Sequence, residues 1–260
     1  MSFLPILDNK HPEAPSVFDP SALLREARRQ KGLPTAAVPS ICILDPDGDI
    51  LRHLKGTGSA WPVETWPCYH TELYSFHLAG RSAGIIGCAV GAPFAVLVAE
   101  ELFASDCRLL ISVTSAGQIV SAGSPPYFVI IDRAVRDEGT SYHYAAPDVF
   151  AEADPGLIAA AKRALQEAGV SAHVGPSWTT DAPFRETAEA IAAARAKGIL
   201  AVEMEAAALY TFARERGRRV LCLAHVTNTM GLAAQDFEKG EAQGADEALR
   251  VLEALARNLK

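Results

Sequence analysis

The chain has 260 residues, of which 49% are hydrophobic and 21% are charged, and its formal net charge is -7. This composition is typical of a globular protein with a sizeable core, and the length allows one large domain or two small ones. The negative charge argues against a nucleic-acid-binding protein, because a surface that follows phosphates needs clustered Lys and Arg. It does not exclude a small anionic ligand, for which one local arginine is enough.

The N-terminal segment and the cysteines indicate a cytoplasmic protein with no membrane partner. The segment MSFLPILDNKHPEAP lacks the basic region and apolar core of a secretory signal, and no apolar run is long enough to span a bilayer. The five cysteines include no C-x-x-C pair and lie mostly in apolar runs. This pattern favours free thiols in a reducing compartment over a disulfide framework.

Helix and strand patterns alternate along the chain. Two of the predicted helices share a signature in which an Asp-Pro pair begins the helix and a glycine ends it. The other elements follow from apolar runs bounded by turn residues. In chain order the predicted elements are a helix at 19–32, a strand at 40–44, a strand pair at 72–90, a helix at 93–106, strands at 108–113 and 126–132, a helix at 154–169, a strand at 171–175, helices at 185–198 and 201–217, a strand at 218–228 and a helix at 244–259.

The alternation from residue 40 onward contains no Pro-, Gly- or Ser-rich linker long enough to divide it. It predicts a single-domain, three-layer αβα fold of the α/β class with a mixed, largely parallel central sheet. We expect residues 1–37 to form an N-terminal extension with one helix, and residues 38–260 to form the main domain.

Ligands bind such sheets where strands end and loops or helices begin. Three predicted turns lie at such ends, DPDGDILR (45–52), SVTSAG (112–117) and AHVTN (224–228). The fourth place is the start of the helix after the apolar run GILAV, where Glu203 and Glu205 flank Met204. Acids in a first turn are favoured by the helix dipole, so capping is one interpretation. The alternative is that this helix start faces a polar ligand that needs a buried acceptor.

The turn DPDGDILR invites a calcium interpretation, but it does not follow the EF-hand pattern, because Gly48 is fourth and the twelfth position is Gly56. A glycine turn followed by Arg52 can instead cradle an anion, although a plain surface turn is the alternative. The hydroxyls of Ser112, Thr114 and Ser115 in SVTSAG offer a second site for an oxyanion, and an ordinary turn is again the alternative.

Other kinds of site are not indicated. The seven histidines are scattered without an H-x-x-x-H pair, so no metal site is predicted, and no G-x-S-x-G elbow is present. The glycine-rich stretch 87–95 lacks the G-x-G-x-x-G spacing of a dinucleotide site. We expect His225, which lies in an apolar strand, to be a core or near-site histidine.

The order of seven motifs resembles the nucleoside phosphorylase family, of the purine nucleoside and uridine phosphorylase type, over about residues 38–260. VEMEAA is the most specific motif, and RDEGTSYHY and TTDAPFRET are similar to the uridine phosphorylase-like branch. The motifs are GDILR (48–52), GAPFAVLVAEEL (91–102), TSAG (114–117), RDEGTSYHY (136–144), TTDAPFRET (179–187), VEMEAAALY (202–210) and VTN (226–228). The resemblance implies a catalytic domain that cleaves the N-glycosidic bond of a nucleoside, with inorganic phosphate as co-substrate and no cofactor.

The resemblance also implies roles for individual residues. Glu205 would accept hydrogen bonds from the ribose hydroxyls and favour positive charge at C1′, with Met204 under the sugar. Glu203 would support this pocket or cap the helix. The implied phosphate ligands are Gly48, Arg52 and Ser115, and the implied contacts to the base are Phe184 and Asn228.

The chain also departs from the family pattern. Ser112 stands where most phosphorylases have a second phosphate-binding arginine, and the arginine that hexameric members borrow from a neighbour has no match near Tyr69 and His70. Each such charge-assisted pair contributes about 1.5–3 kcal/mol, so weakened phosphate binding is expected. Two alternatives therefore stay open, a hydrolytic nucleosidase and a nucleoside-binding protein. The hydrolase branch relies on an Asp where this chain has Asn228, which argues against water as the acceptor.

The resemblance narrows the choice of nucleobase and implies an oligomeric state. The Gln-x-Arg pair by which uridine phosphorylases recognise uracil is missing after APF. An amide at Asn228 suits an oxygen-bearing base, so uridine or a 6-oxopurine nucleoside is expected. The family implies a homo-oligomer, based on dimers and commonly a hexamer.

Overall fold

The structure is a computed structural model that describes residues 4–229, 239 and 241–259. Its helices are α1 (Pro20–Lys31), α2 (Asp49–Gly56), α3 (Ala92–Phe103), α4 (Pro155–Glu167), α5 (Ala188–Ala196), α6 (Ala206–Arg216) and α7 (Ala245–Asn258), with short 3-10 turns η1 (Ser141–His143), η2 (Pro183–Arg185) and η3 (Glu241–Gly244). Its strands are β1 (Ile41–Asp45), β2 (Ala60–Pro62), β3 (Tyr74–Leu78), β4 (Arg81–Gly87), β5 (Leu109–Gln118), β6 (Tyr127–Asp137), β7 (Phe150–Glu152), β8 (Ala172–Thr180), β9 (Ala201–Glu203) and β10 (Val220–Thr229).

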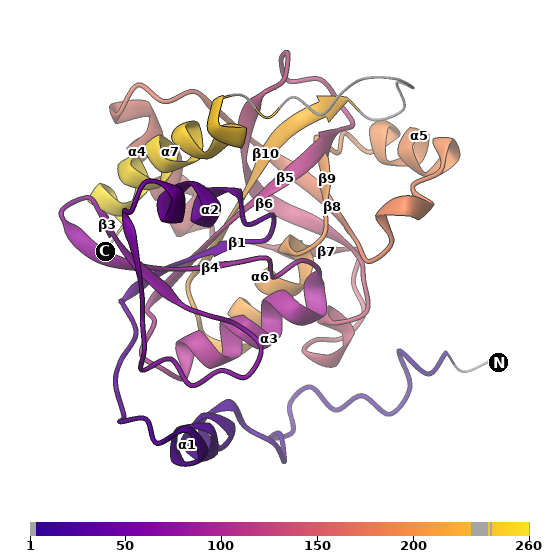
Figure 1. The fold of residues 1–260 in the computed structure, drawn as a ribbon. Helices are drawn as coiled ribbons and strands as arrows, with labels where there is room; N and C mark the ends of the chain where they lie inside the picture. The colour runs from indigo at the N-terminus through magenta and orange to yellow at the C-terminus, as the bar shows by residue number, and fades with distance from the viewer. Residues whose placement is uncertain (1–3, 230–238, 240, 260) are drawn as a thin grey trace.

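These strands form one mixed ten-stranded sheet with helices on both faces, which confirms the predicted fold class (Figure 1). β1 lies between β4 and β5 and is parallel to both, and β5 is parallel to β10. From β10 the sheet continues through β6, β8 and β9, and β9 pairs again with β5, so these five strands close into a ring. The antiparallel strands β3 and β2 form the open edge.

The core has a layer on each face of the sheet. One layer packs under α3 and α6 and contains Leu102, Leu110 and Phe212. The other packs under α2, α4 and α7 and contains Ile111 and Leu252. Figure 1 shows these two groups of helices on opposite sides of the strands. None of the helices in the described ranges is long and apolar enough to cross a membrane.

The predicted first helix is present. The side chain of Asp19 accepts a hydrogen bond from the Ala22 amide at 2.9 Å, and Gly32 ends the helix with a φ of 66°. α1 packs against α3, and its residues Leu24 and Ala27 are buried. The division of the chain at residue 37 stays a prediction, although this packing accounts for an amphipathic helix in the extension.

Three boundaries differ from the sequence-based expectation. The stretch after β1 is not a simple turn, because Asp49 begins the helix α2, which buries Ile50 and Leu54 one turn apart. The expected turn at 114–117 lies inside β5, because β5 pairs there with β10 and β9. The helix expected from residue 201 begins at Ala206, so the acidic pair precedes it.

Candidate active site

Glu203 ends β9 and binds the start of α6. Its Oε1 accepts hydrogen bonds from the hydroxyls of Ser177 at 2.9 Å and Thr179 at 2.5 Å. Its Oε2 accepts from the backbone amides of Glu205 and Ala206, both at 2.7 Å. Burial raises the pKa of Glu203, and these four hydrogen bonds oppose the shift. The capping role considered for the acidic pair therefore belongs to Glu203.

Glu205 has a different environment. It is 1% exposed, and its Oε1 accepts a hydrogen bond from the backbone amide of Gly91 at 2.7 Å. Its Oε2 is buried without a hydrogen-bond partner among the described residues. Burial, and next the charge of Glu203, raise the pKa of Glu205 to about 8, and the Gly91 amide and the nearby Thr114 hydroxyl oppose this shift. A buried carboxyl oxygen without a partner is costly in a folded protein, so this atom is available to accept a hydrogen bond from a polar ligand.

The turn after β1 is held in one conformation. Gly48 has a φ of 75°, and a Cβ atom there would lie 2.6 Å from Sγ of Cys88 and 2.9 Å from the Arg52 guanidinium. The carboxylate of Asp45 accepts from the amides of Gly48 at 3.1 Å and Leu51 at 2.9 Å. Burial raises the pKa of Asp45 to about 7. Glycine is therefore required at position 48, and the lack of a side chain would also let the backbone approach a ligand closely.

The structure brings this turn to Ser115, but through a residue that the sequence analysis did not assign. The backbone amide and the hydroxyl of Ser115 each donate a hydrogen bond of 2.7 Å to the carboxylate of Asp47. Lys239 lies beside them, with Nζ 2.5 Å from Asp49 Oδ2 and 3.8 Å from Asp47 Oδ1. The sequence signal for this contact is the alternation of Asp45, Asp47 and Asp49 in the turn.

Arg52 and Ser115 line different hollows. Its guanidinium donates to the backbone carbonyl of Asp47 at 3.0 Å and forms an ion pair with Asp49, and its side chain is 62% exposed. It lines a cleft of about 430 Å³ together with Gly48, Cys88 and Phe94. An anion in this cleft would meet the guanidinium from the solvent side.

The two residues expected to contact the base lie in different settings. Asn228 is half-buried near the end of β10, opposite Gly117 of β5. Phe184 lies in η2 and is 98% exposed, so none of the described residues packs on its ring to hold it over a base. The half-buried Met204 lies between the two glutamates. The roles of all three residues stay predictions.

His225 lies near the seat formed by Ser115. It is directly opposite Ser115 in the β5–β10 ladder, is 5% exposed, and stacks on Phe128 with 4.5 Å between ring centroids. Its Nε2 is buried without a partner among the described residues, and burial lowers the pKa of His225 to about 4. The imidazole is therefore neutral at physiological pH. Within the described residues, no group of three His, Cys, Asp or Glu side chains is placed to hold a metal ion.

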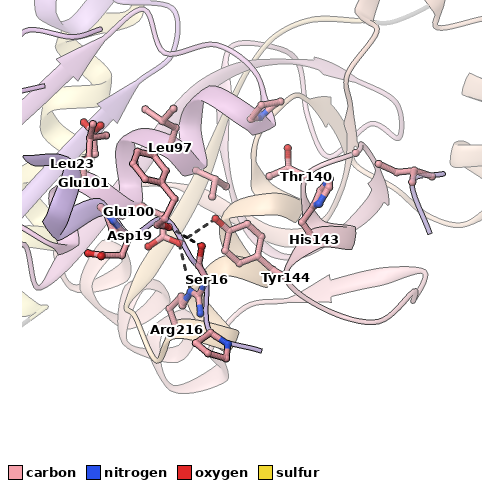
Figure 2. A pocket seen from close by; sticks show the side chains of 17 residues that line it. Ser16, Asp19, Leu23, Leu97, Glu100, Glu101, Thr140, His143, Tyr144 and Arg216 are labelled. Atoms are coloured by element: carbon pink, nitrogen blue, oxygen red, sulfur yellow. Dashed lines mark hydrogen bonds and ion pairs between the residues drawn. The ribbon is translucent and has the colours of Figure 1, made fainter. Parts of the chain in front are cut away.

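The cavity in Figure 2 is separate from these residues. It has a volume of about 860 Å³ and is lined by the N-terminal segment, α3 and the loop around η1. At one side Glu100 accepts a hydrogen bond from the Tyr144 hydroxyl at 3.1 Å and pairs with Arg216 at 3.5 Å. None of the predicted site residues lines it.

Comparison with known proteins identifies the family. A family model described as the phosphorylase superfamily matches residues 40–257. A uridine phosphorylase of Thermococcus kodakarensis is 29% identical over 79% of this chain and 83% of its own length. A DeoD-type purine nucleoside phosphorylase of Roseobacter denitrificans is 30% identical over 62% of this chain and 71% of its own length. A guanosine phosphorylase of Halorubrum lacusprofundi is 26% identical over 64% and 66%.

The fold and these matches define a phosphorylase-type enzyme of the pentosyltransferase class. The chain belongs to the phosphorylase superfamily, as its motifs predicted. The relatives differ in the nucleosides that their names contain, so the family alone does not select a base.

Proposed function

We propose that the protein cleaves the N-glycosidic bond of a nucleoside and transfers the pentosyl group to inorganic phosphate. The observation that carries this proposal is the buried Oε2 of Glu205, which has no partner among the described residues. A sugar hydroxyl can donate to this oxygen, while Gly91 holds the other oxygen at 2.7 Å. The carboxyl group is therefore oriented before the sugar arrives.

The reaction breaks the bond between C1′ and the base nitrogen, and the base leaves with the bonding electron pair. A phosphate oxygen then forms the new bond to C1′, and the proton that the phosphate loses is taken up by the departed base, which gives a pentose 1-phosphate and the neutral free base. Positive charge grows on the sugar during this exchange. In the empty site, burial and the charge of Glu203 raise the pKa of Glu205 to about 8, which disfavours the ionised carboxylate. Donor hydroxyls and a cationic sugar both favour its ionised form, so the stabilisation increases toward the transition state.

For the base we propose an oxygen-bearing one, as in uridine or a 6-oxopurine nucleoside. The amide of Asn228 can both donate and accept, which suits a carbonyl next to a ring N–H. An amide cannot protonate a ring nitrogen, which would assist the departure of adenine. The names of the relatives, which include uridine, guanosine and purine nucleoside phosphorylases, agree with this range.

A second candidate is a hydrolytic nucleosidase on the same scaffold. The observation that favours it is the carboxylate of Asp47, which occupies both the amide and the hydroxyl of Ser115. Ser112, at the position of the family's second phosphate arginine, is 1% exposed and supplies no charge. A water acceptor would require neither the release of Ser115 from Asp47 nor a second positive charge at position 112.

Product analysis separates the two candidates. The purified protein is incubated with inosine, uridine or adenosine, with and without phosphate, and free base and pentose 1-phosphate are measured. Cleavage that requires phosphate supports the proposed function, and cleavage without phosphate supports the nucleosidase. Binding of a nucleoside without turnover would contradict both. The homo-oligomer stays a prediction, which sedimentation of the same preparation would test.

A further inference from the structure

A carboxylate of the chain itself lies on the hydrogen-bond donors that the proposed function assigns to phosphate. The two oxygens of Asp47 accept from the amide and from the hydroxyl of Ser115, both at 2.7 Å. A phosphate ion at this position would also use two anionic oxygens to accept from one N–H and one O–H donor. A phosphate ion that binds there must therefore displace the Asp47 carboxylate from both donors of Ser115.

Hydrogen bonds fix the backbone around Asp47, whereas its side chain can rotate from Ser115 toward Lys239. Asp45 accepts hydrogen bonds from Gly48 and Leu51, which holds the turn on both sides of Asp47. The side chain of Asp47 is 30% exposed, and the ammonium of Lys239 lies 3.8 Å from its Oδ1. Rotation toward Lys239 would release Ser115 while keeping the carboxylate next to a cation.

The charges around the seat strengthen the competition. The nearby cations Arg52 and Lys239 both form ion pairs with Asp49, so the charge of each is already partly neutralised before an added anion binds. A phosphate at Ser115 must also approach the carboxylates of Asp47 and Asp49. The negative charge of Asp47 thus opposes phosphate in addition to occupying its donors.

We propose that Asp47 is a tethered anion that competes with phosphate for Ser115 and so sets the affinity of the enzyme for its acceptor. The inference rests on the proposed function, since it takes Ser115 as part of the phosphate site. It makes Asp47 a residue that determines acceptor specificity and that acts by leaving the site.

Direct phosphate binding tests the inference without relying on turnover. The variants Asp47→Ala and Asp47→Asn are titrated with inorganic phosphate by calorimetry at fixed ionic strength, with melting temperatures as a check on folding. Asp47→Ala is expected to bind phosphate about tenfold more tightly than the parent, which is the lower end of a charge-assisted hydrogen bond. Asp47→Asn should be intermediate, because its amide oxygen still accepts from Ser115 but carries no charge.

Two further variants separate competition from a general charge effect. Glu72→Gln removes one negative charge from the cleft that contains Arg52, but Glu72 bonds Tyr74 and does not contact Ser115. It is expected to change phosphate affinity less than twofold. In a Ser115→Ala background the gain from Asp47→Ala should shrink, because the contested hydroxyl is gone.

The outcomes distinguish this inference from the proposed function. If Asp47→Ala tightens phosphate binding but phosphate never supports cleavage, the competition between Asp47 and phosphate at Ser115 is supported and the proposed function fails. If cleavage requires phosphate but the folded Asp47 variants bind it no better than the parent, the inference fails alone. Loss of phosphate-independent cleavage in both variants, without a gain in phosphate affinity, would overturn it in favour of Asp47 as a base for water.

Discussion

The candidate site has a sugar half around Glu205 and an acceptor half around Ser115, and the two differ in whether their hydrogen-bonding groups already have partners within the chain. At the sugar half, Glu205 has one oxygen held by Gly91 and the other buried without a partner among the described residues. At the acceptor half, both donors of Ser115 are satisfied by Asp47. The sugar half therefore gains a hydrogen bond when substrate binds, whereas the acceptor half exchanges one for another. Changes at the sugar half should alter rate, and changes at the acceptor half should alter concentration dependence.

The largest effect is expected from Glu205→Ala. Its hydrogen bonds strengthen as the sugar becomes cationic, and the loss of such a contribution lowers kcat by about 10²–10³. Steady-state kinetics with the preferred nucleoside measures this, together with the melting temperature of the variant.

Glu203→Gln is the matched comparison for that variant. Glu203 accepts four hydrogen bonds within the fold, so its replacement should lower the melting temperature more than Glu205→Ala does. A Glu205 variant that melts early but keeps full activity per folded molecule would reverse the assignment of the two glutamates.

Asn228→Asp is expected to shift base preference toward adenosine. A carboxylic acid can protonate a ring nitrogen, which the amide cannot do. Mismatched polar groups can cost factors of 10⁴ in specificity, but Asn228 is half-buried and water can soften the mismatch, so about tenfold is expected. The ratio of kcat/KM for adenosine to that for inosine or uridine measures the shift. No change in this ratio, or a parent protein that prefers adenosine, would remove Asn228 from base recognition.

Arg52→Ala is expected to raise KM for phosphate severalfold and to leave KM for the nucleoside nearly unchanged. A desolvated charge-assisted pair would contribute more, but this side chain is 62% exposed and already paired with Asp49, so solvent screening reduces its contribution. Initial rates over a matrix of phosphate and nucleoside concentrations separate the two constants. An unchanged phosphate dependence would place the acceptor away from this guanidinium.

The smallest expected effect is a pH dependence of stability that Glu205→Gln removes. Because the pKa of Glu205 is raised to about 8 from an ordinary 4.5, the folded chain holds a proton that the unfolded chain loses between these values. The stability associated with this proton is fully present below pH 4.5 and is lost as pH rises to about 8. The melting temperature of Glu205→Gln relative to the parent should therefore increase from pH 5 to pH 8. Parallel curves for the two proteins would contradict the raised pKa.

The order of elements could be predicted from sequence, because helix starts such as Asp19 and apolar runs such as 40–44 are local signals. The limits of α2 and β5 could not, since both depend on tertiary partners. Pairing with β10 and β9 extends β5 through the expected turn at 114–117. The burial of Ile50 and Leu54 under the helical layer accounts for α2.

The candidate site divides in the same way. Glu205 was singled out by its motif, but sequence alone could not choose between ligand binding and capping. The choice depends on Ser177 and Thr179, which satisfy Glu203 from another strand. The contact between Asp47 and Ser115 joins residues 68 positions apart, and no local pattern reports such a pairing.

A crystal structure of the protein with a nucleoside and phosphate tests the central claim most directly. We expect a ribose hydroxyl within about 2.5–3.0 Å of Glu205 Oε2, and a phosphate oxygen in place of Asp47 on the Ser115 amide and hydroxyl. A nucleoside bound elsewhere, for example in the cavity of Figure 2, with Oε2 of Glu205 still without a partner, would contradict the account.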